Sequence, residues 1–322
     1  MMFTTIRQLA LISRAEFLLP NLGSLIMGLA WGVKPPIDIT NLVILLVFLF
    51  TIINLSSIIG AQANAIFDYE LDLRDFRKKE LVQAFDDFGR NRLKNMLIAE
   101  MVITFILVVV FTLIRANPIL LVLWLVGIAL GYFYSAPPLR IKSRSWWAPI
   151  TMILVLAVFP VLFAFFTFTS LFEFPFLLAI SGLALTVYGV IIHTEIRDYF
   201  SDKEMGIKTM TVRLGLICAS LLSIVFLSLG GILVGTSFTI AFFHGRYPIL
   251  SLLFIVIAII DFFVLQKIKK LYKLSQEYEK SNNQRSIERK ITDFSANNPK
   301  WIMLVTQTYS MISVIMLVSK FI

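Results

Sequence analysis

Residues 41–72 read NLVILLVFLFTIINLSSIIGAQANAIFDYELD, an apolar run that ends in acidic residues. The apolar part, residues 41–67, is longer than the roughly 20 residues that a helix needs to cross about 30 Å of hydrocarbon. It is continuously apolar and does not alternate, which favours a membrane-spanning helix over a barrel strand. The stretch therefore predicts a transmembrane helix with carboxylates at one end.

Similar apolar runs recur along all 322 residues, and 58% of the residues are hydrophobic. Soluble domains have roughly 45–50% apolar residues, and a mean hydropathy of +0.85 leaves no soluble interpretation. We expect one membrane-embedded domain over 1–322, an all-α integral membrane protein of about nine transmembrane helices. The first run begins near Ala15 and is too long and continuous for a cleavable signal peptide. The expected spans are residues 15–33, 41–67, 95–114, 118–135, 147–168, 173–194, 216–238, 248–266 and 301–321.

The positive charge of the chain, +9 overall, lies in the segments between these spans. With nine helices, 25 of the 29 Lys and Arg residues, including Arg7 and Arg14, fall on the side of the N-terminus. Because basic residues concentrate on the cytoplasmic side, this asymmetry predicts a multi-pass cell-membrane protein with a cytoplasmic N-terminus. The same distribution argues against nucleic acid as a partner. The opposite side would hold only Lys34, Arg115, Arg246 and Lys320.

Two of the predicted cytoplasmic connections are long. Residues 68–94 mix charges with apolar residues such as Phe76, Phe85 and Phe88, which predicts an amphipathic helix over the cytoplasmic mouth. Residues 267–300 are rich in Lys, Glu, Asn and Ser. There we expect a helical extension of the eighth span and then a flexible linker, a solvated connector that also attracts anionic lipid heads.

The acidic residues at the end of the second span form the first candidate cluster. Asp68 and Asp72 are four residues apart, and Asn64 lies one turn earlier, so a continuous helix places all three on one face. Burying carboxylates at a membrane boundary is costly unless they are paired or bind a cation. Two carboxylates and an amide oxygen suit Mg²⁺. Taken alone, the cluster is equally compatible with a solvated helix end.

A second acidic cluster makes the cation site the better interpretation. Asp198 and Asp202 follow Asp68 and Asp72 by 130 residues, again at the end of a span, and Glu195 adds a further acid. Two carboxylate sets facing across a cavity are able to hold two or more Mg²⁺ ions together with phosphate oxygens of a substrate. The pair of clusters therefore predicts a phosphorylated ligand.

Basic and hydroxyl side chains near these clusters fit the same ligand. Tyr134 and Ser135 are hydrogen-bond donors after the fourth span, and Arg140 and Lys142 follow two prolines. The two basic residues are able to neutralise a leaving diphosphate, although they also fit a plain topology signal. Arg197 is either an ion-pair partner of the adjacent acids or a phosphate ligand. His193 is more typical of a hydrogen-bonded structural residue than of a base.

The motifs together resemble those of the UbiA superfamily of intramembrane prenyltransferases. The resemblance rests on Asn64-x₃-Asp68-x₃-Asp72 and Asp198-x₃-Asp202, and it extends through Val212-Arg213-Leu214-Gly215. It implies helices around a central cavity that opens to the cytoplasmic side. It also implies Mg²⁺ bound by the motif residues Asn64, Asp68, Asp72, Asp198 and Asp202, and an isoprenyl diphosphate bound by Arg140, Lys142 and Arg197. Tyr134 and Ser135 would line the site.

The chain also departs from the family pattern. Ala65 replaces the acid that many members carry after the first Asn, and an Arg-Pro pair after the motif is replaced by Arg77-Lys78-Lys79. Lys78 and Lys79 are still able to supply charge there.

The resemblance implies transfer of an isoprenyl group to a lipid-soluble or interfacial acceptor, with an aromatic quinone-type precursor as our first choice. Ether-lipid (geranylgeranylglyceryl phosphate), carotenoid and chlorophyllide acceptors are alternatives. A terpene cyclase of the same fold needs no acceptor. A transporter is the remaining alternative, but it requires acids near the bilayer midplane, and only Asp261 approaches that position.

Overall fold

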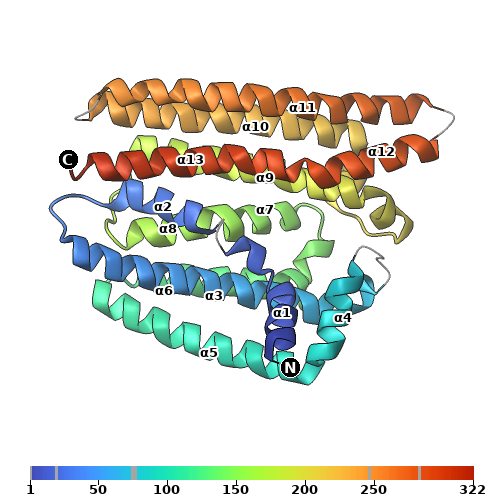
Figure 1. Cartoon of the computed structure of the whole chain (residues 1–322), viewed down its shortest axis with the longest axis horizontal. Helices are drawn as coiled ribbons and strands as arrows, with labels where there is room; N and C mark the ends of the chain where they lie inside the picture. Colours follow the sequence, from blue (N-terminus) through green and yellow to red (C-terminus); the bar gives the residue numbers. More distant parts are fainter. Residues whose placement is uncertain (1, 19–20, 74–77, 246–247, 282–283) are drawn as a thin grey trace.

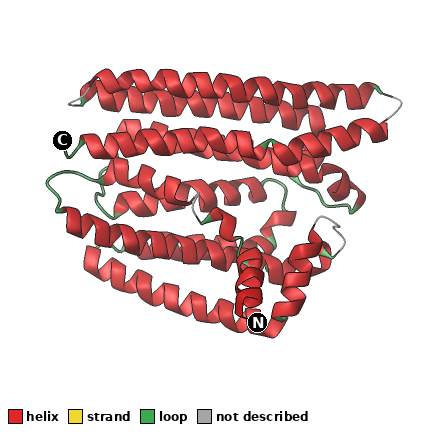
Figure 2. Ribbon diagram, in the orientation of Figure 1, coloured by secondary structure: helices red, strands yellow, loops and turns green. Residues whose placement is uncertain are grey.

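A computed structural model describes residues 2–18, 21–73, 78–245, 248–281 and 284–322. In these ranges the chain is helical almost throughout, and no strand occurs (Figure 2). Most of the helices lie side by side with their axes roughly parallel or antiparallel (Figure 1). The all-helical prediction is therefore confirmed for the described part of the chain.

Among the described residues, six helical segments are long and apolar enough to cross a membrane. Each supplies its own backbone hydrogen bonds, which is the requirement for spanning hydrocarbon. One of them consists of α7 (Trp147–Ile153), a π-helical turn (Leu154–Val158) and α8 (Phe159–Phe166). Another joins a short 3₁₀ segment (Pro248–Leu253) to α11 (Phe254–Lys280). The remaining four are α3 (Ile39–Asp72), α5 (Arg90–Arg115), α9 (Phe174–Glu204) and α10 (Met210–His244).

Three shorter apolar helices pack among them: α2 (Asn21–Gly32), α6 (Ile119–Ser135) and α13 (Pro299–Ser319). α2 packs against α8 and α13. The expected first span over 15–33 was too long, because Ala15–Phe17 form a separate 3₁₀ turn and α2 begins at Asn21. Residues 19–20 of that span lie outside the described residues.

The most extensive helix pair is α9 with α10, and small residues allow it. A Cβ atom on Gly182 would lie 2.7 Å from the carbonyl oxygen of Gly230, so only glycine permits this approach. Small residues at such crossings are the usual means of close helix packing in membranes, where the hydrophobic effect does not drive association. The contact fixes α9, and with it the second acidic motif.

Two helices run across the others at the end of the bundle where α3 ends, which we call the site end (Figure 1). They are α1 (Met2–Ile12) and α4 (Lys79–Phe88), and they pack against each other. α4 buries Phe85 and Phe88 while its charged face stays exposed. The predicted amphipathic helix in 68–94 is thus confirmed, although Phe76 lies outside the described residues.

The segment between the last two apolar helices differs from the prediction. The helical extension is confirmed, since α11 continues to Lys280. The prediction of a flexible linker is wrong, because residues Gln284–Asn297 form a helix, α12, that packs against α9 and α11. Ile287, Ile291 and Phe294 form an apolar stripe at helical spacing that accounts for this docking. Residues 282–283 lie outside the described residues.

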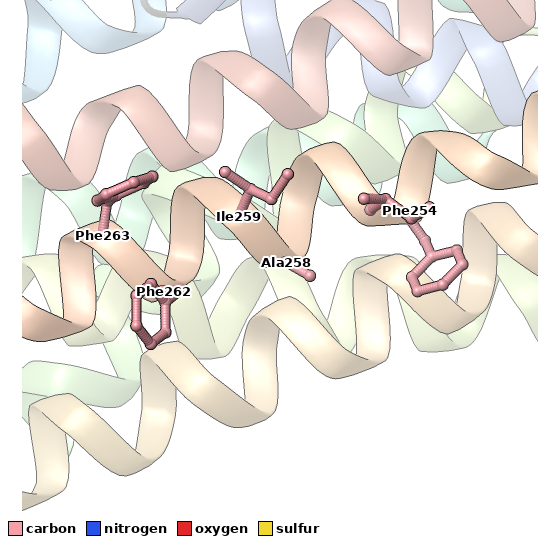
Figure 3. A pocket seen from close by; sticks show the side chains of 6 residues that line it. Phe254, Ala258, Ile259, Phe262 and Phe263 are labelled. Atoms are coloured by element: carbon pink, nitrogen blue, oxygen red, sulfur yellow. The ribbon is translucent and has the colours of Figure 1, made fainter.

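The outer face of α11 is apolar. Phe254, Ile259, Phe262 and Phe263 project from it and border a shallow recess with no charged side chain in its lining (Figure 3). Such a face on a long apolar helix suits contact with lipid chains. It offers no group that would recognise a polar ligand.

Candidate active site

The first acidic motif is ordered by hydrogen bonds along α3. Asp68 and Asp72 are buried, with only 5% and 4% of their surface exposed. The amide nitrogen of Asn64 donates to Oδ2 of Asp68 at 2.6 Å, so these two side chains share a helix face, as their spacing predicts. Burial of two carboxylates at one helix end requires compensating charge or hydrogen bonds.

The end of α6 supplies part of that compensation. The hydroxyl of Ser135 donates to Oδ2 of Asp68 at 3.1 Å and lies 2.8 Å from the donating amide nitrogen of Asn64. Ser135 is itself buried. The contact brings the loop after α6 onto the first motif, so Asn64, Asp68 and Ser135 form one polar cluster.

Basic side chains from two loops supply the charge. Lys142 forms an ion pair with Asp68, and Arg140 lies 3.9 Å from the same oxygen. Nζ of Lys78, which precedes α4, lies 2.5 Å from Oδ1 of Asp72. Burial lowers the pKa of the Lys142 ammonium, while the charge and hydrogen bond of Asp68 act in the opposite direction. Each carboxylate of the first motif thus has a basic partner.

The second motif lies on α9. Arg197 forms two hydrogen bonds with Asp198, from Nε to Oδ1 and from Nη2 to Oδ2, each 3.0 Å long. Asp202 follows one turn later, and its backbone carbonyl accepts a hydrogen bond from the amide of Ile207. Of the two interpretations for Arg197, the ion pair is the one present in this structure. Tyr199 is buried and belongs to the apolar cluster formed with α12.

Glu195 has a different role from the other acids. Its Oε2 accepts hydrogen bonds from the backbone amide of Thr211 at 3.2 Å and from the Thr211 hydroxyl at 2.7 Å. These bonds tie α9 to the first turn of α10, where Thr209 caps the amide of Val212. Glu195 therefore joins two helices and does not extend the row of candidate metal ligands.

Tyr134, at the end of α6, is near enough to both motifs for their charges to act on its hydroxyl. These charges are those of Asp68 in the first motif and of Glu195 and Asp202 in the second. In the described part of the chain, however, no three acidic, His or Cys side chains are close enough together to hold a metal by themselves. Any shared metal would need further oxygens, such as those of a phosphate.

His193 has a structural environment, as predicted. It is fully buried, with Nε2 lying 3.0 Å from the hydroxyl of Ser223 on α10 and Nδ1 lying 3.5 Å from the amide of Asn298. These contacts join α9 to α10 and to the start of α13.

Comparison with known proteins agrees with this arrangement. The model of the UbiA prenyltransferase family matches residues 21–278, so the chain belongs to that family. It is therefore a prenyltransferase, and its apolar helices indicate a multi-pass membrane protein. A search of the curated proteins gave no match.

Solved structures share the fold at low sequence identity. A UbiA homologue from Archaeoglobus fulgidus bound to DMAPP and Mg²⁺ has a TM-score of 0.63 and 18% identity, covering 93% of this chain and 99% of that one. The apo UbiA homologue from Aeropyrum pernix K1 has a TM-score of 0.63 and 14% identity over 88% and 96% of the two chains. A digeranylgeranylglyceryl phosphate synthase has a TM-score of 0.60 and 16% identity over 95% and 99%.

Proposed function

We propose that this protein transfers an isoprenyl group from an isoprenyl diphosphate to a lipid-soluble or interfacial acceptor in a Mg²⁺-dependent reaction at the site end. The observation that carries the proposal is the polar cluster of Asn64, Asp68 and Ser135, in which the buried Asp68 pairs with Lys142. The charges of Asp68 and of Asp202 in the second motif both act on Tyr134. Isoprenyl diphosphates and Mg²⁺ are also the ligands of Archaeoglobus fulgidus homologues with this fold.

The donor set fits Mg²⁺. Hard divalent cations prefer carboxylate and amide oxygens and retain positions for phosphate oxygens or water. The lysines beside Asp68 and Asp72 support the assignment, because they show that these carboxylates attract positive charge. When bound, the metal would stabilise negative charge on the leaving diphosphate. The side chains proposed to hold it are Asn64, Asp68, Asp72, Asp198 and Asp202.

The basic side chains would bind the diphosphate. Arg140, Lys142 and Arg197 lie beside the aspartates, where they would neutralise the charge of a bound diphosphate. Guanidinium and ammonium donors placed where charge develops lower the barrier to cleavage of the allylic C–O bond. Tyr134 and Ser135 would orient the diphosphate or the reacting carbon.

A quinone-type aromatic precursor remains our preferred acceptor, with ether-lipid, carotenoid and chlorophyllide acceptors and terpene cyclisation as alternatives. A transporter is less well supported, because the acids with basic partners gather at one end of the bundle. Asp261 lies deeper, and its carboxyl packs closely against Gly231 on α10.

For the whole chain we propose one domain, 1–322, with nine membrane spans around a cavity that opens to the cytoplasmic side. The six long apolar helices and the three shorter ones supply nine candidates. The excess of Lys and Arg on one side supports a cytoplasmic site end in the cell membrane. Of the residues that set this balance, Arg74, Arg77 and Arg246 lie outside the described residues.

The test is product analysis with purified protein in lipid nanodiscs. Prenyl diphosphates of several lengths are supplied with Mg²⁺ and a panel of acceptors, and products are identified by mass spectrometry. We expect a prenylated acceptor and released diphosphate, both abolished by EDTA. A cyclic hydrocarbon formed without acceptor would identify a cyclase instead, and diphosphate release that persists in EDTA would contradict the metal assignment.

A further inference from the structure

The exposed side of α11 changes from apolar to basic along the helix. Its middle part exposes apolar side chains, among them Phe262 and Phe263 (Figure 3). Nearer the site end (Figure 1), four exposed lysines lie within seven residues, and we call them the lysine stretch: Lys267, Lys269, Lys270 and Lys273. No acidic residue lies between Asp261 and Glu277. Positive charge is therefore concentrated on a short part of one helix.

Most of the lysine stretch continues the apolar face of α11. With 3.6 residues per turn, Lys269 and Lys273 lie within about 20° of Phe262 around the helix axis, and Lys270 lies about 20° from Phe263. Only 11% of the apolar part of α11 is buried, compared with 22–50% in the other five long apolar segments. The bundle therefore leaves this face of α11 to the surrounding lipid.

The spacing along α11 places the lysines at the level of lipid headgroups. Lys267 and Lys270 follow Phe263 by four and seven residues, which is about 6–11 Å along the axis at 1.5 Å per residue. The headgroup layer extends about 5–7 Å beyond the hydrocarbon on each side of a bilayer. Lys273 lies farther out, but a lysine side chain is long enough to reach back towards this layer.

An exposed tryptophan lies beside the first of these lysines. Trp301, in the first turn of α13, is 48% exposed, and the ammonium of Lys267 lies 3.3 Å from the centre of its ring. Trp concentrates at membrane interfaces, where one part of the ring meets hydrocarbon and the N–H meets water. Lys270 similarly lies 5.4 Å from the ring of Phe294 on α12. These contacts place the lysine stretch beside an interfacial aromatic side chain.

The protein does not neutralise the charge of the lysine stretch. None of the four lysines forms an ion pair with a carboxylate in the part of the chain that the structure describes. The lysines of the candidate active site differ, since Lys78 and Lys142 each pair with a buried aspartate. A ring contact leaves the full charge of an ammonium group in place. The lysine stretch therefore remains able to bind an anion from outside the protein.

We propose that the lysine stretch and Trp301 bind the phosphate groups of anionic phospholipids in the leaflet at the site end. One lipid molecule matches the whole face, because its acyl chains contact the apolar part of α11 while its phosphate reaches the lysines. Clusters of lysines next to a membrane-spanning helix attract anionic headgroups in this way. The inference goes beyond the proposed function and holds whichever acceptor the protein uses.

The test measures lipid binding to the full chain in detergent by native mass spectrometry. Dioleoyl phosphatidylglycerol, which is anionic, is compared with dioleoyl phosphatidylcholine, which has the same chains and no net charge. We expect the unmodified protein to bind phosphatidylglycerol at least about tenfold more tightly. The double variant Lys269→Gln/Lys273→Gln should reduce this preference about fivefold or more. These side chains are exposed, so its melting temperature should be unchanged.

Two further variants separate position from net charge. Lys280→Gln/Arg285→Gln removes the same charge from exposed residues, and Lys280 lies about 25 Å beyond Phe263 along α11, outside the headgroup layer. It should keep the preference for phosphatidylglycerol within about twofold of the unmodified value. Lys269→Arg/Lys273→Arg keeps both charges and should also retain the preference.

Three results would overturn the inference. The first is an unchanged preference in Lys269→Gln/Lys273→Gln, and the second is an equal loss in Lys280→Gln/Arg285→Gln, which would show an effect of net charge alone. The third comes from glycerol phosphate, which has the phosphate without acyl chains. We expect a tenfold excess of it to leave phosphatidylglycerol bound. Full displacement would show a site for soluble phosphates instead of lipids.

Discussion

The ammonium group of Lys78 lies 2.5 Å from Oδ1 of Asp72, so a basic residue from the start of α4 pairs with the last carboxylate of α3. Asp72 is buried, whereas about a third of the Lys78 side chain is exposed. Lys78 therefore compensates the charge of Asp72 when no metal is present.

Replacing Lys78 should thus affect the metal-free protein most. We expect Lys78→Gln to destabilise it by about 1–3 kcal/mol, because a buried carboxylate loses its partner. Adding Mg²⁺ should offset much of this loss, so the rise in melting temperature on adding Mg²⁺ should be larger than for the unmodified protein. Thermal unfolding in detergent measures both. Lys79→Gln, one residue along, is the control, and an identical Mg²⁺ response in all three proteins would contradict the role of Lys78.

The aspartates of the two motifs should be essential for turnover and dispensable for folding. We expect Asp68→Ala and Asp202→Ala each to lower diphosphate release by at least about 100-fold, since each removes a proposed metal ligand. Elution volume in size-exclusion chromatography should be unchanged. Glu277→Ala, on the exposed surface of α11, should retain activity. Near-normal diphosphate release by the aspartate variants would refute the metal assignment.

Glu195 should act on stability and not on metal binding. Its carboxylate accepts two hydrogen bonds from Thr211, and each hydrogen bond to a charged group contributes about 1.5–3 kcal/mol. Thr211→Val removes the hydroxyl donor, so it and Glu195→Gln should both lower the melting temperature. In the double variant, the loss of stability should be smaller than the sum of the two single losses, because the two residues share the same hydrogen bonds. The Mg²⁺ concentration for half-maximal activity should stay constant; a large increase in Glu195→Gln would instead show that this acid contributes to the metal site.

The local part of the site could be predicted from the sequence. Asn64, Asp68 and Asp72 follow each other at four-residue spacing in an apolar helix, and helical geometry alone places them on one face. Some helix ends were predicted to within a few residues where apolar runs stop, but α3 and α9 continue into their acidic motifs, and α10 extends six residues beyond the expected 216–238 at each end.

Contacts between distant segments could not be predicted in the same way. In the sequence, Glu195 is an acid three residues before Asp198 and resembles a further metal ligand. Only its hydrogen bond with Thr211, on another helix, shows that it joins α9 to α10. α12 was missed because its polar composition outweighs a stripe of three apolar residues that becomes meaningful only once α9 and α11 are beside it.

The contact between Gly231 and Asp261 gives a prediction away from the site end. A Cβ on Gly231 would overlap Oδ2 of Asp261, so Gly231→Ala must displace the Asp261 carboxyl from the face of α10. We expect a loss of about 1–3 kcal/mol, typical of overpacking, measured as a lower melting temperature. In an Asp261→Ala background the same glycine substitution should cost much less, because the clashing oxygen is absent. Equal losses in the two backgrounds would show that α10 and α11 do not approach each other at this position.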